Sequence, residues 1–148
     1  FANDGHLAQL SLVKGGGGVG RKPVFSAKTT RELRAMLHLA TGDEGTAPRA
    51  QTLGYSVGGK TGTAHKLIDG RYAKDRYRGF FVGLAPIEAP RIVVAVLIDD
   101  PRGKQYFGGL VAAPVFSETV QQTLRLMGVE PDVNVKPNIH AKGAKEPV

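Results

Sequence analysis

Gly58-Gly59-Lys60-Thr61-Gly62-Thr63-Ala64 is the stretch of this 148-residue chain that says most about its fold. It stands within residues 55–68, which show no helical apolar stripe. Asp69-Gly70 follows directly, and this pair is typical of a tight turn. We therefore expect these residues to form an extended strand that ends in a reverse turn.

Two further strands are predicted after this one, at residues 79–85 and 91–98. The residues from Pro86 to Pro90 form a connection of hairpin length between them. The second strand is apolar on both faces, which favours a central position in its sheet.

A helix is predicted upstream of these strands, over residues 29–40. Thr29 and Glu32 form a capping box at its start. The apolar side chains expected to face the core have helical spacing: Leu33, Met36, Leu37 and Ala40. His38 lies off this stripe and is expected to be solvated.

A last helix is predicted from Pro114 to a stop at Gly128, and no periodic pattern follows it. We expect residues 1–128 to form the C-terminal portion of an incomplete domain and residues 129–148 to form a disordered basic tail. The chain begins at Phe1 and not at Met, which we interpret as the mark of a fragment.

The composition excludes several classes of protein. Cysteine is absent, so disulfides, thiolate nucleophiles and cysteine-type zinc sites are excluded. The formal charge of +7 is scattered and not interleaved with aromatic residues, which indicates a solvated basic surface and no nucleic-acid partner. The four histidines lack metal-ligand spacing, so the sequence predicts neither a metal nor a cofactor.

Two nucleotide-binding patterns also occur. Residues 15–20 fit G-x-G-x-x-G, but the predicted helix begins too far downstream to bind a pyrophosphate. Residues 54–61 fit the P-loop pattern G-x-x-x-x-G-K-[ST], which requires a buried strand before it and a helix after it. The residues around Lys60 predict neither, and a P-loop-type nucleotide-binding protein is kept as an alternative, beside a non-catalytic interaction module.

Lys60-Thr61-Gly62 is also a motif of serine β-lactamases and penicillin-binding proteins. A strand with a free edge can pair with an extended peptide, and Gly62 leaves room for that peptide to lie close. The hydroxyl groups of Thr61 and Thr63 can donate to a carboxylate. The fixed charge of Lys60 can stabilise anions and assist proton movement beside a nucleophile.

A wider set of blocks resembles the class B penicillin-binding proteins of Gram-negative bacteria. The resemblance covers about residues 1–128. Within the family, the pattern of this chain most resembles the septal peptidoglycan transpeptidases of the penicillin-binding protein 3 type. The blocks that carry it are residues 58–64, 69–72, 81–86, 98–101, 106–109 and 112–116.

The resemblance implies an α/β (α+β) fold, a fragment of the penicillin-binding transpeptidase and serine β-lactamase-like fold with an antiparallel sheet flanked by helices. It implies catalytic roles for Lys60 and Thr63, the latter through a backbone N–H that stabilises an oxyanion. The residues expected to bind substrate are Thr61, Gly62, Thr63, Tyr106, Phe107 and Gly108. His65 stands where relatives often carry arginine.

The same resemblance implies a periplasmic, serine-type D,D-transpeptidase that cross-links stem peptides during septal cell-wall synthesis and is acylated by β-lactams. Its implied partners are stem peptides ending in D-Ala-D-Ala, β-lactam antibiotics, the upstream half of the domain, and divisome proteins including the cognate glycosyltransferase. An upstream segment is expected to anchor the parent protein in the inner membrane.

The nucleophile of this family is the serine of an S-x-x-K at a helix start, well upstream of the Lys-Thr-Gly strand. Ser11-Leu12-Val13-Lys14 fits that pattern, but it lies on a strand-like segment and too near Lys60 in the sequence. No S-x-N occurs in the chain. We therefore expect the isolated fragment to be inactive.

Overall fold

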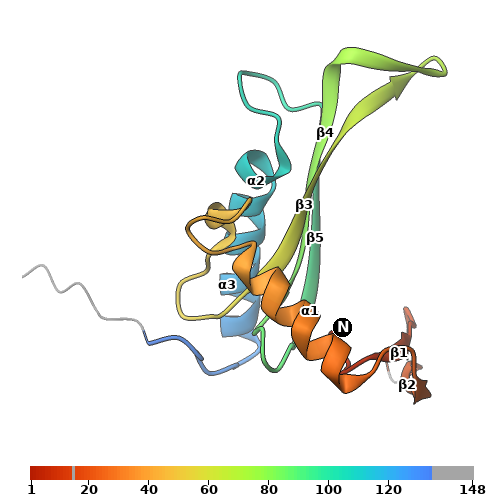
Figure 1. Ribbon diagram of the computed structural model, residues 1–148, viewed down its shortest axis with the longest axis vertical. Helices are drawn as coiled ribbons and strands as arrows, with labels where there is room; N and C mark the ends of the chain where they lie inside the picture. Colours follow the sequence, from red (N-terminus) through yellow and green to blue (C-terminus); the bar gives the residue numbers. More distant parts are fainter. Residues whose placement is uncertain (15, 135–148) are drawn as a thin grey trace, which may run out of the picture.

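The computed structural model describes residues 1–14 and 16–134 of the chain (Figure 1). The predicted tail beyond residue 134 lies outside the described residues. The elements, in chain order, are β1 (His6–Gln9), β2 (Gly18–Pro23), α1 (Ala27–Leu39), the 3-10 helix η1 (Pro48–Ala50), β3 (Gly58–Ile68), β4 (Arg71–Ala85), β5 (Ile92–Asp99), α2 (Gly108–Val111) and α3 (Ala113–Leu126).

The main sheet is antiparallel and has the order β3-β4-β5, while β1 and β2 form a separate antiparallel pair. The predicted turn joins β3 to β4, because Asp69 and Gly70 both adopt positive φ angles, 48° and 76°. β4 is longer than predicted: β5 pairs only with its residues 78–85. The remainder of β4 continues with the end of β3 as a two-stranded ribbon beyond the sheet (Figure 1).

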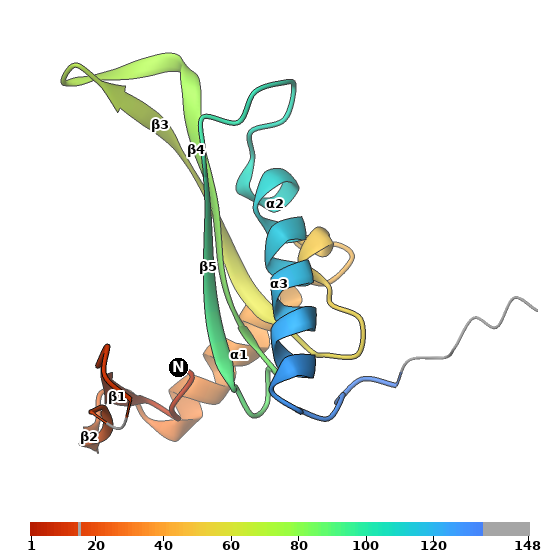
Figure 2. The same ribbon diagram turned by 180° about the vertical axis from the view of Figure 1, so that it is seen from behind.

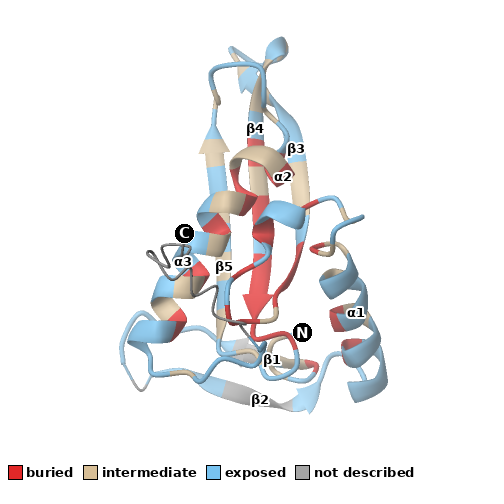
Figure 3. Ribbon diagram, turned by 90° about the vertical axis from the view of Figure 1, so that its left-hand side faces the viewer, coloured by how far each residue is buried: buried red, intermediate tan, exposed pale blue. Residues whose placement is uncertain are grey.

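One face of this sheet packs against α3 (Figure 2). The rings of Phe81 on β4 and Phe116 on α3 meet edge to face with centroids 4.7 Å apart, and both residues are fully buried. Gly83 faces Phe116 so closely that a side chain there would meet its ring. Figure 3 shows the buried residues gathered along β4 and the inner side of α3.

β5, which was predicted to be central because it is apolar on both faces, alternates between half-buried and exposed residues. Ile92, Val94, Val96 and Ile98 pack against the α3 core, whereas Val93 and Leu97 on the opposite face remain 58% and 59% exposed. β5 is an edge strand among the described residues. Its predicted central position therefore stays a prediction about a larger sheet.

α1 covers the start of β3 on the face opposite α3. A side chain at Gly58 would meet the α1 backbone at Leu37 and His38, so glycine permits this close approach. The predicted N-cap is wrong: the helix begins two residues earlier, and Ser26 Oγ accepts from Thr29 N–H at 3.1 Å.

The predicted apolar stripe of α1 is only partly covered: Leu33, Leu37 and Ala40 are half-buried, and Met36 is exposed. The buried residues of this helix are Thr30 and Arg34, while Met36 is 60% exposed. Arg34 can be buried because its guanidinium donates to Phe1 O at 2.7 Å and to Glu88 O at 3.2 Å, and pairs with Asp4 at 2.8 Å. Hydrophobic periodicity does not detect a charged residue that is buried with all its partners.

Residues 129–134 contact the segment that leads into β3. Tyr55 Oη donates to Val129 O at 2.8 Å, and Asp132 accepts from Ser56 N–H at 2.8 Å. These contacts fall on the first residues of the predicted tail. Among the described residues, none of the helices has the length and apolar character needed to cross a bilayer.

We predict that Arg34→Met lowers the free energy of unfolding of the protein by about 2–3 kcal/mol, because the carbonyl groups of Phe1 and Glu88 lose a charged donor. The matched control is Arg31→Met on the exposed side of the same helix, for which the expected change is within about 0.5 kcal/mol. Urea unfolding measures both. Equal effects of the two substitutions would contradict the structural role given to Arg34.

Candidate functional site

Lys60, Thr61, Gly62 and Thr63 lie inside β3, which continues without a break to Ile68. The P-loop alternative is therefore wrong, because the residues after Lys60-Thr61 form a strand and not the helix whose N-terminus would bind phosphate. The extended conformation predicted for this stretch is confirmed.

Backbone hydrogen bonding determines which peptide groups of β3 are free. Asp100 N–H donates to Tyr77 O, so odd-numbered residues of β4 direct their peptide groups toward β5 and even-numbered ones toward β3. Lys60 pairs with Val82 and Gly62 with Phe80. The N–H and C=O groups of Thr61 and Thr63 therefore point to the open edge of β3, where an extended peptide can pair with them.

The side chain of Lys60 reaches the same edge from the other face of the strand. Lys60 and Thr61 leave β3 on opposite faces, as successive strand residues do. The Lys60 ammonium nevertheless bends back to Thr61, with Nζ 3.1 Å from Thr61 O and 3.4 Å from Thr61 Oγ1. No carboxylate of the described residues pairs with Lys60, so the edge presents an uncompensated positive charge beside hydroxyl groups and amides.

Thr63 is held by the segment that leads into α2. Gly108, the first residue of that short helix, donates its N–H to Thr63 Oγ1 at 3.2 Å. The Thr63 hydroxyl is thus an acceptor toward Gly108, and its own hydrogen remains available for another partner. Gly108 is thereby brought next to the Lys-Thr-Gly strand, directly after Tyr106 and Phe107, and the substrate-binding role of these three residues stays a prediction.

Gly62 and Gly108 are both required by close packing. A side chain at Gly62 would overlap the ring of Phe80, and one at Gly108 would collide with backbone oxygens of Phe80 and Gly62. From the sequence, the close approach of a substrate was the only reason expected for a glycine at position 62. The structure adds a second reason, since Phe80 covers the face of β3 on which Gly62 lies.

Charged side chains fasten the ribbon where it leaves the sheet. Asp99 accepts from Lys66 at 2.7 Å and from Arg78 at 2.8 Å, and Arg76 forms an ion pair with Asp100. Hydrogen bonds from Lys66 and Arg78 lower the pKa of Asp99, and the hydrogen bond from Arg76 lowers the pKa of Asp100. The end of β5 is thereby joined to both strands of the ribbon.

Of the aromatic residues in this region, Tyr77 was not predicted from the sequence. Tyr77 on β4 stacks on Tyr106 with ring centroids 4.0 Å apart, and His65 packs on the other side of Tyr77 at 4.7 Å. Desolvation raises the pKa of Tyr77, and its interaction with Tyr106 raises it further. Strand alternation could have predicted that Thr63 and His65 lie on the same face of β3. Nothing in the sequence predicts the contact between Tyr77 and Tyr106.

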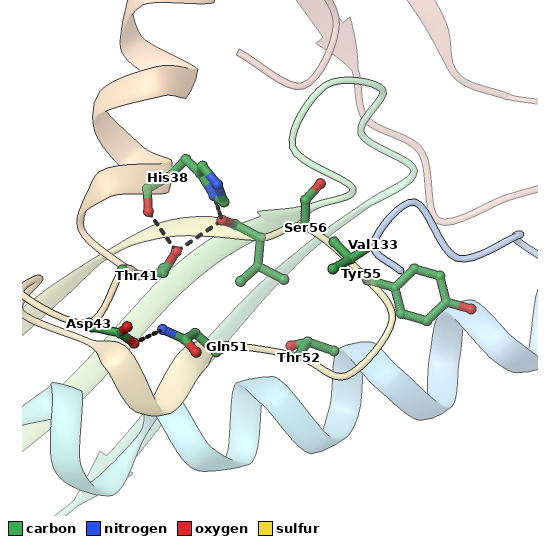
Figure 4. A pocket seen from close by; sticks show the side chains of 10 residues that line it. His38, Thr41, Asp43, Gln51, Thr52, Tyr55, Ser56 and Val133 are labelled. Carbon is green, nitrogen blue, oxygen red and sulfur yellow. Dashed lines mark hydrogen bonds between the residues drawn. The ribbon is translucent and has the colours of Figure 1, made fainter. Parts of the chain in front are cut away.

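A separate cavity of about 320 Å³ lies beside the C-terminal end of α1 (Figure 4). His38, predicted to be solvated, is exposed, yet its Nδ1 lies 2.7 Å from Val57 O. Thr41 donates to the same carbonyl at 3.0 Å. These bonds fix the residue before β3 begins and place no group near Lys60.

Ser11 does not occupy the setting of a nucleophile. It lies in an exposed turn after β1, and its hydroxyl is bonded only locally, to the backbone of Val13 at 3.0 Å. The S-x-x-K match at residues 11–14 is therefore not at the start of a helix.

Comparison with known families supports this description of the strand. Residues 1–121 match the family described as penicillin binding protein transpeptidase domain. The chain is 40% identical to the probable peptidoglycan D,D-transpeptidase PenA of Neisseria flavescens, over 88% of the chain and 33% of that protein. It is 42% identical to the probable peptidoglycan D,D-transpeptidase PbpC of Pseudomonas aeruginosa, over 89% of the chain and 23% of that protein.

A solved structure agrees with the fold. The apo transpeptidase domain of penicillin-binding protein 3 from Burkholderia pseudomallei superposes with a TM-score of 0.79 and 43% identity, covering 90% of this chain and 41% of that one. The predicted fold class is confirmed. The chain spans only about a quarter to a third of the length of the first two relatives.

We predict that Gly108→Ala destabilises the protein by about 1–3 kcal/mol, because the added methyl group has only backbone atoms to displace. Gly18→Ala in β2 is the control, since a side chain there meets nothing within 4 Å. Chemical denaturation distinguishes the two. A Gly108→Ala protein as stable as the control would show that the loop does not pack on β3 as described.

The ion pairs of Asp99 and Asp100 predict a dependence on pH. Their pKa values are lowered in the folded state, so both stabilise it fully above their ordinary pKa near 4 and lose this effect as the pH falls below that value. We expect the double substitution of Asp99 and Asp100 by Asn to lower the thermal midpoint at pH 7. The difference from the unsubstituted protein should shrink on acidification toward pH 3, and a constant difference would contradict this origin.

Proposed function

The chain belongs to the penicillin-binding protein transpeptidase domain family, and from this premise we propose that it supplies the substrate-binding strand of a peptidoglycan D,D-transpeptidase. One observation carries the proposal: the open edge of β3 presents the amides of Thr61 and Thr63 beside the Lys60 ammonium, which pairs with no carboxylate in the described part of the chain. An extended peptide that ends in a carboxylate complements this edge by strand pairing and by charge.

The substrate of this proposal is a stem peptide ending in D-Ala-D-Ala. Its backbone pairs with β3, while the Thr61 and Thr63 hydroxyl groups donate to the terminal carboxylate. In this proposal Gly62, which has the ring of Phe80 over its own face, lets the peptide lie close to the edge of β3, and Tyr106, Phe107 and Gly108 border the same place.

The proposed reaction is acyl transfer through a serine located elsewhere in the protein. The serine oxygen attacks the carbonyl carbon of the penultimate D-Ala, the peptide bond breaks, and the terminal D-Ala leaves with a proton. An acceptor amine then attacks the ester and returns a proton to the serine oxygen. Lys60 assists the proton movements, and the Thr63 N–H stabilises the oxyanion, a type of contact that is worth about 3–4 kcal/mol.

β-Lactams present a carboxylate and a reactive carbonyl in a comparable arrangement, and we propose that they acylate the same serine. The relatives are named as D,D-transpeptidases, among them FtsI of Escherichia coli at 37% identity over 83% of the chain and 21% of that protein. We further propose a septal role in the periplasm, in a protein anchored to the inner membrane. Divisome proteins, including the cognate glycosyltransferase, are the proposed partners.

The remainder of the transpeptidase domain is a further proposed partner of this segment. Val82, Val93 and Leu97 are exposed on the sheet face that α1 leaves open. Burying such side chains is favourable by about 25 cal/mol per Å² of apolar area, which supports packing of the upstream half against this face.

Labelling by a fluorescent penicillin tests the proposal in the full transpeptidase that contains this segment. We expect the Lys60→Ala substitution to slow acylation by a factor of about 100 or more, because a charge that assists the nucleophile is lost. Lys74→Ala, which removes an exposed lysine from the ribbon, is the control and should label normally. Equal labelling of the Lys60→Ala protein, or no labelling of the unsubstituted enzyme, would refute the proposal and favour an interaction module.

A further inference from the structure

Four rings form a continuous row on the α2 side of β3. The rings belong to His65, Tyr77, Tyr106 and Phe107, and successive centroids are 4.7, 4.0 and 4.5 Å apart. Three separate segments contribute them: β3, β4 and the connection between β5 and α2. We call this row the aromatic stack.

His65 is fixed at one end of the aromatic stack by a hydrogen bond. Its Nδ1 lies 2.8 Å from Ala73 O, and because a carbonyl oxygen only accepts, Nδ1 carries the hydrogen. His65 is also the direct cross-strand neighbour of Tyr77. The register of β3 against β4 shifts just after it, between His65 and Leu67. The bond to Ala73 therefore joins the two strands at the place where their ladder is weakest.

The other end of the aromatic stack is joined to Thr63 through the backbone of the next residue, Gly108. Phe107 immediately precedes Gly108, whose N–H donates to Thr63 Oγ1 at 3.2 Å. This bond makes the Thr63 hydroxyl an acceptor on one side and directs its hydrogen elsewhere. A carboxylate can only accept, so recognising one requires this orientation.

We propose that His65 is a positioning residue for the proposed transpeptidase reaction. Its ring holds Tyr77 and, through Tyr106 and Phe107, keeps Gly108 within hydrogen-bond distance of Thr63 Oγ1. His65 does not touch the substrate in this proposal. It acts through the aromatic stack by keeping the Thr63 hydroxyl directed at the substrate carboxylate. The proposal for His65 thus rests on the function proposed for Thr63.

A double-mutant cycle on penicillin acylation of the full transpeptidase tests this coupling. We expect His65→Ala to lower the second-order rate constant about three- to tenfold, because the hydrogen bond from Thr63 to the substrate carboxylate is weakened and not removed. In a Thr63→Val protein, which lacks the hydroxyl, the same His65→Ala change should have no further effect. Tyr72→Ala on the same ribbon is the control, since Tyr72 is 75% exposed and outside the aromatic stack.

A conservative variant and a spectrum separate positioning from simple stabilisation. His65→Phe keeps a ring against Tyr77, so its acylation rate should exceed that of His65→Ala, and its near-ultraviolet circular dichroism should stay close to that of the unsubstituted protein. Additive effects of His65→Ala and Thr63→Val would overturn the proposal, as would a normal acylation rate with only a lowered thermal midpoint. Failure of the unsubstituted enzyme to react with penicillin would instead refute the proposed function.

Discussion

The hydrogen-bonded ladder between β3 and β4 is the interaction on which the other features of this structure depend. β4 pairs with a strand on each side. The residues of β4 that bond to β5 therefore determine which of its residues bond to β3, and hence which backbone N–H and C=O groups of β3 face the open edge. A slip of one residue would turn the peptide groups of Thr61 and Thr63 inward and move every side chain of β3 to the other face. Close packing at Gly58, Gly62 and Gly83 opposes such a slip, because a side chain at any of these positions would displace neighbouring atoms.

The ladder also explains how groups from opposite faces of one strand come to act together. Lys60 and Thr61 diverge by strand geometry, yet the length of the lysine side chain brings its ammonium around the edge to Thr61 Oγ1. Thr63 is oriented from outside the strand, by Gly108. The site is therefore assembled along the edge of the sheet and not on either of its faces.

Much of this could be predicted from the sequence. The strand at Lys60, the turn at Asp69-Gly70 and the terminal helix follow from local patterns, and the structure contains each of them. The buried face of α1 could not be predicted, because Arg34 is buried only where Phe1, Asp4 and Glu88 supply its partners. The aromatic stack escaped prediction for a similar reason. Its contacts join residues far apart in the chain, and no local spacing connects Tyr77 with Tyr106.

An open strand edge has a further consequence for solubility. The backbone groups at the open edge of β3, to which the proposed peptide would bind, could equally well pair with a strand of another molecule. A proline or a covering loop at this edge would prevent both kinds of pairing. A lysine placed in the middle of an edge strand opposes such association, since two like strands would bring their charges together. The exposed Lys60 ammonium therefore disfavours self-association at the edge of β3 to which the proposed substrate would bind.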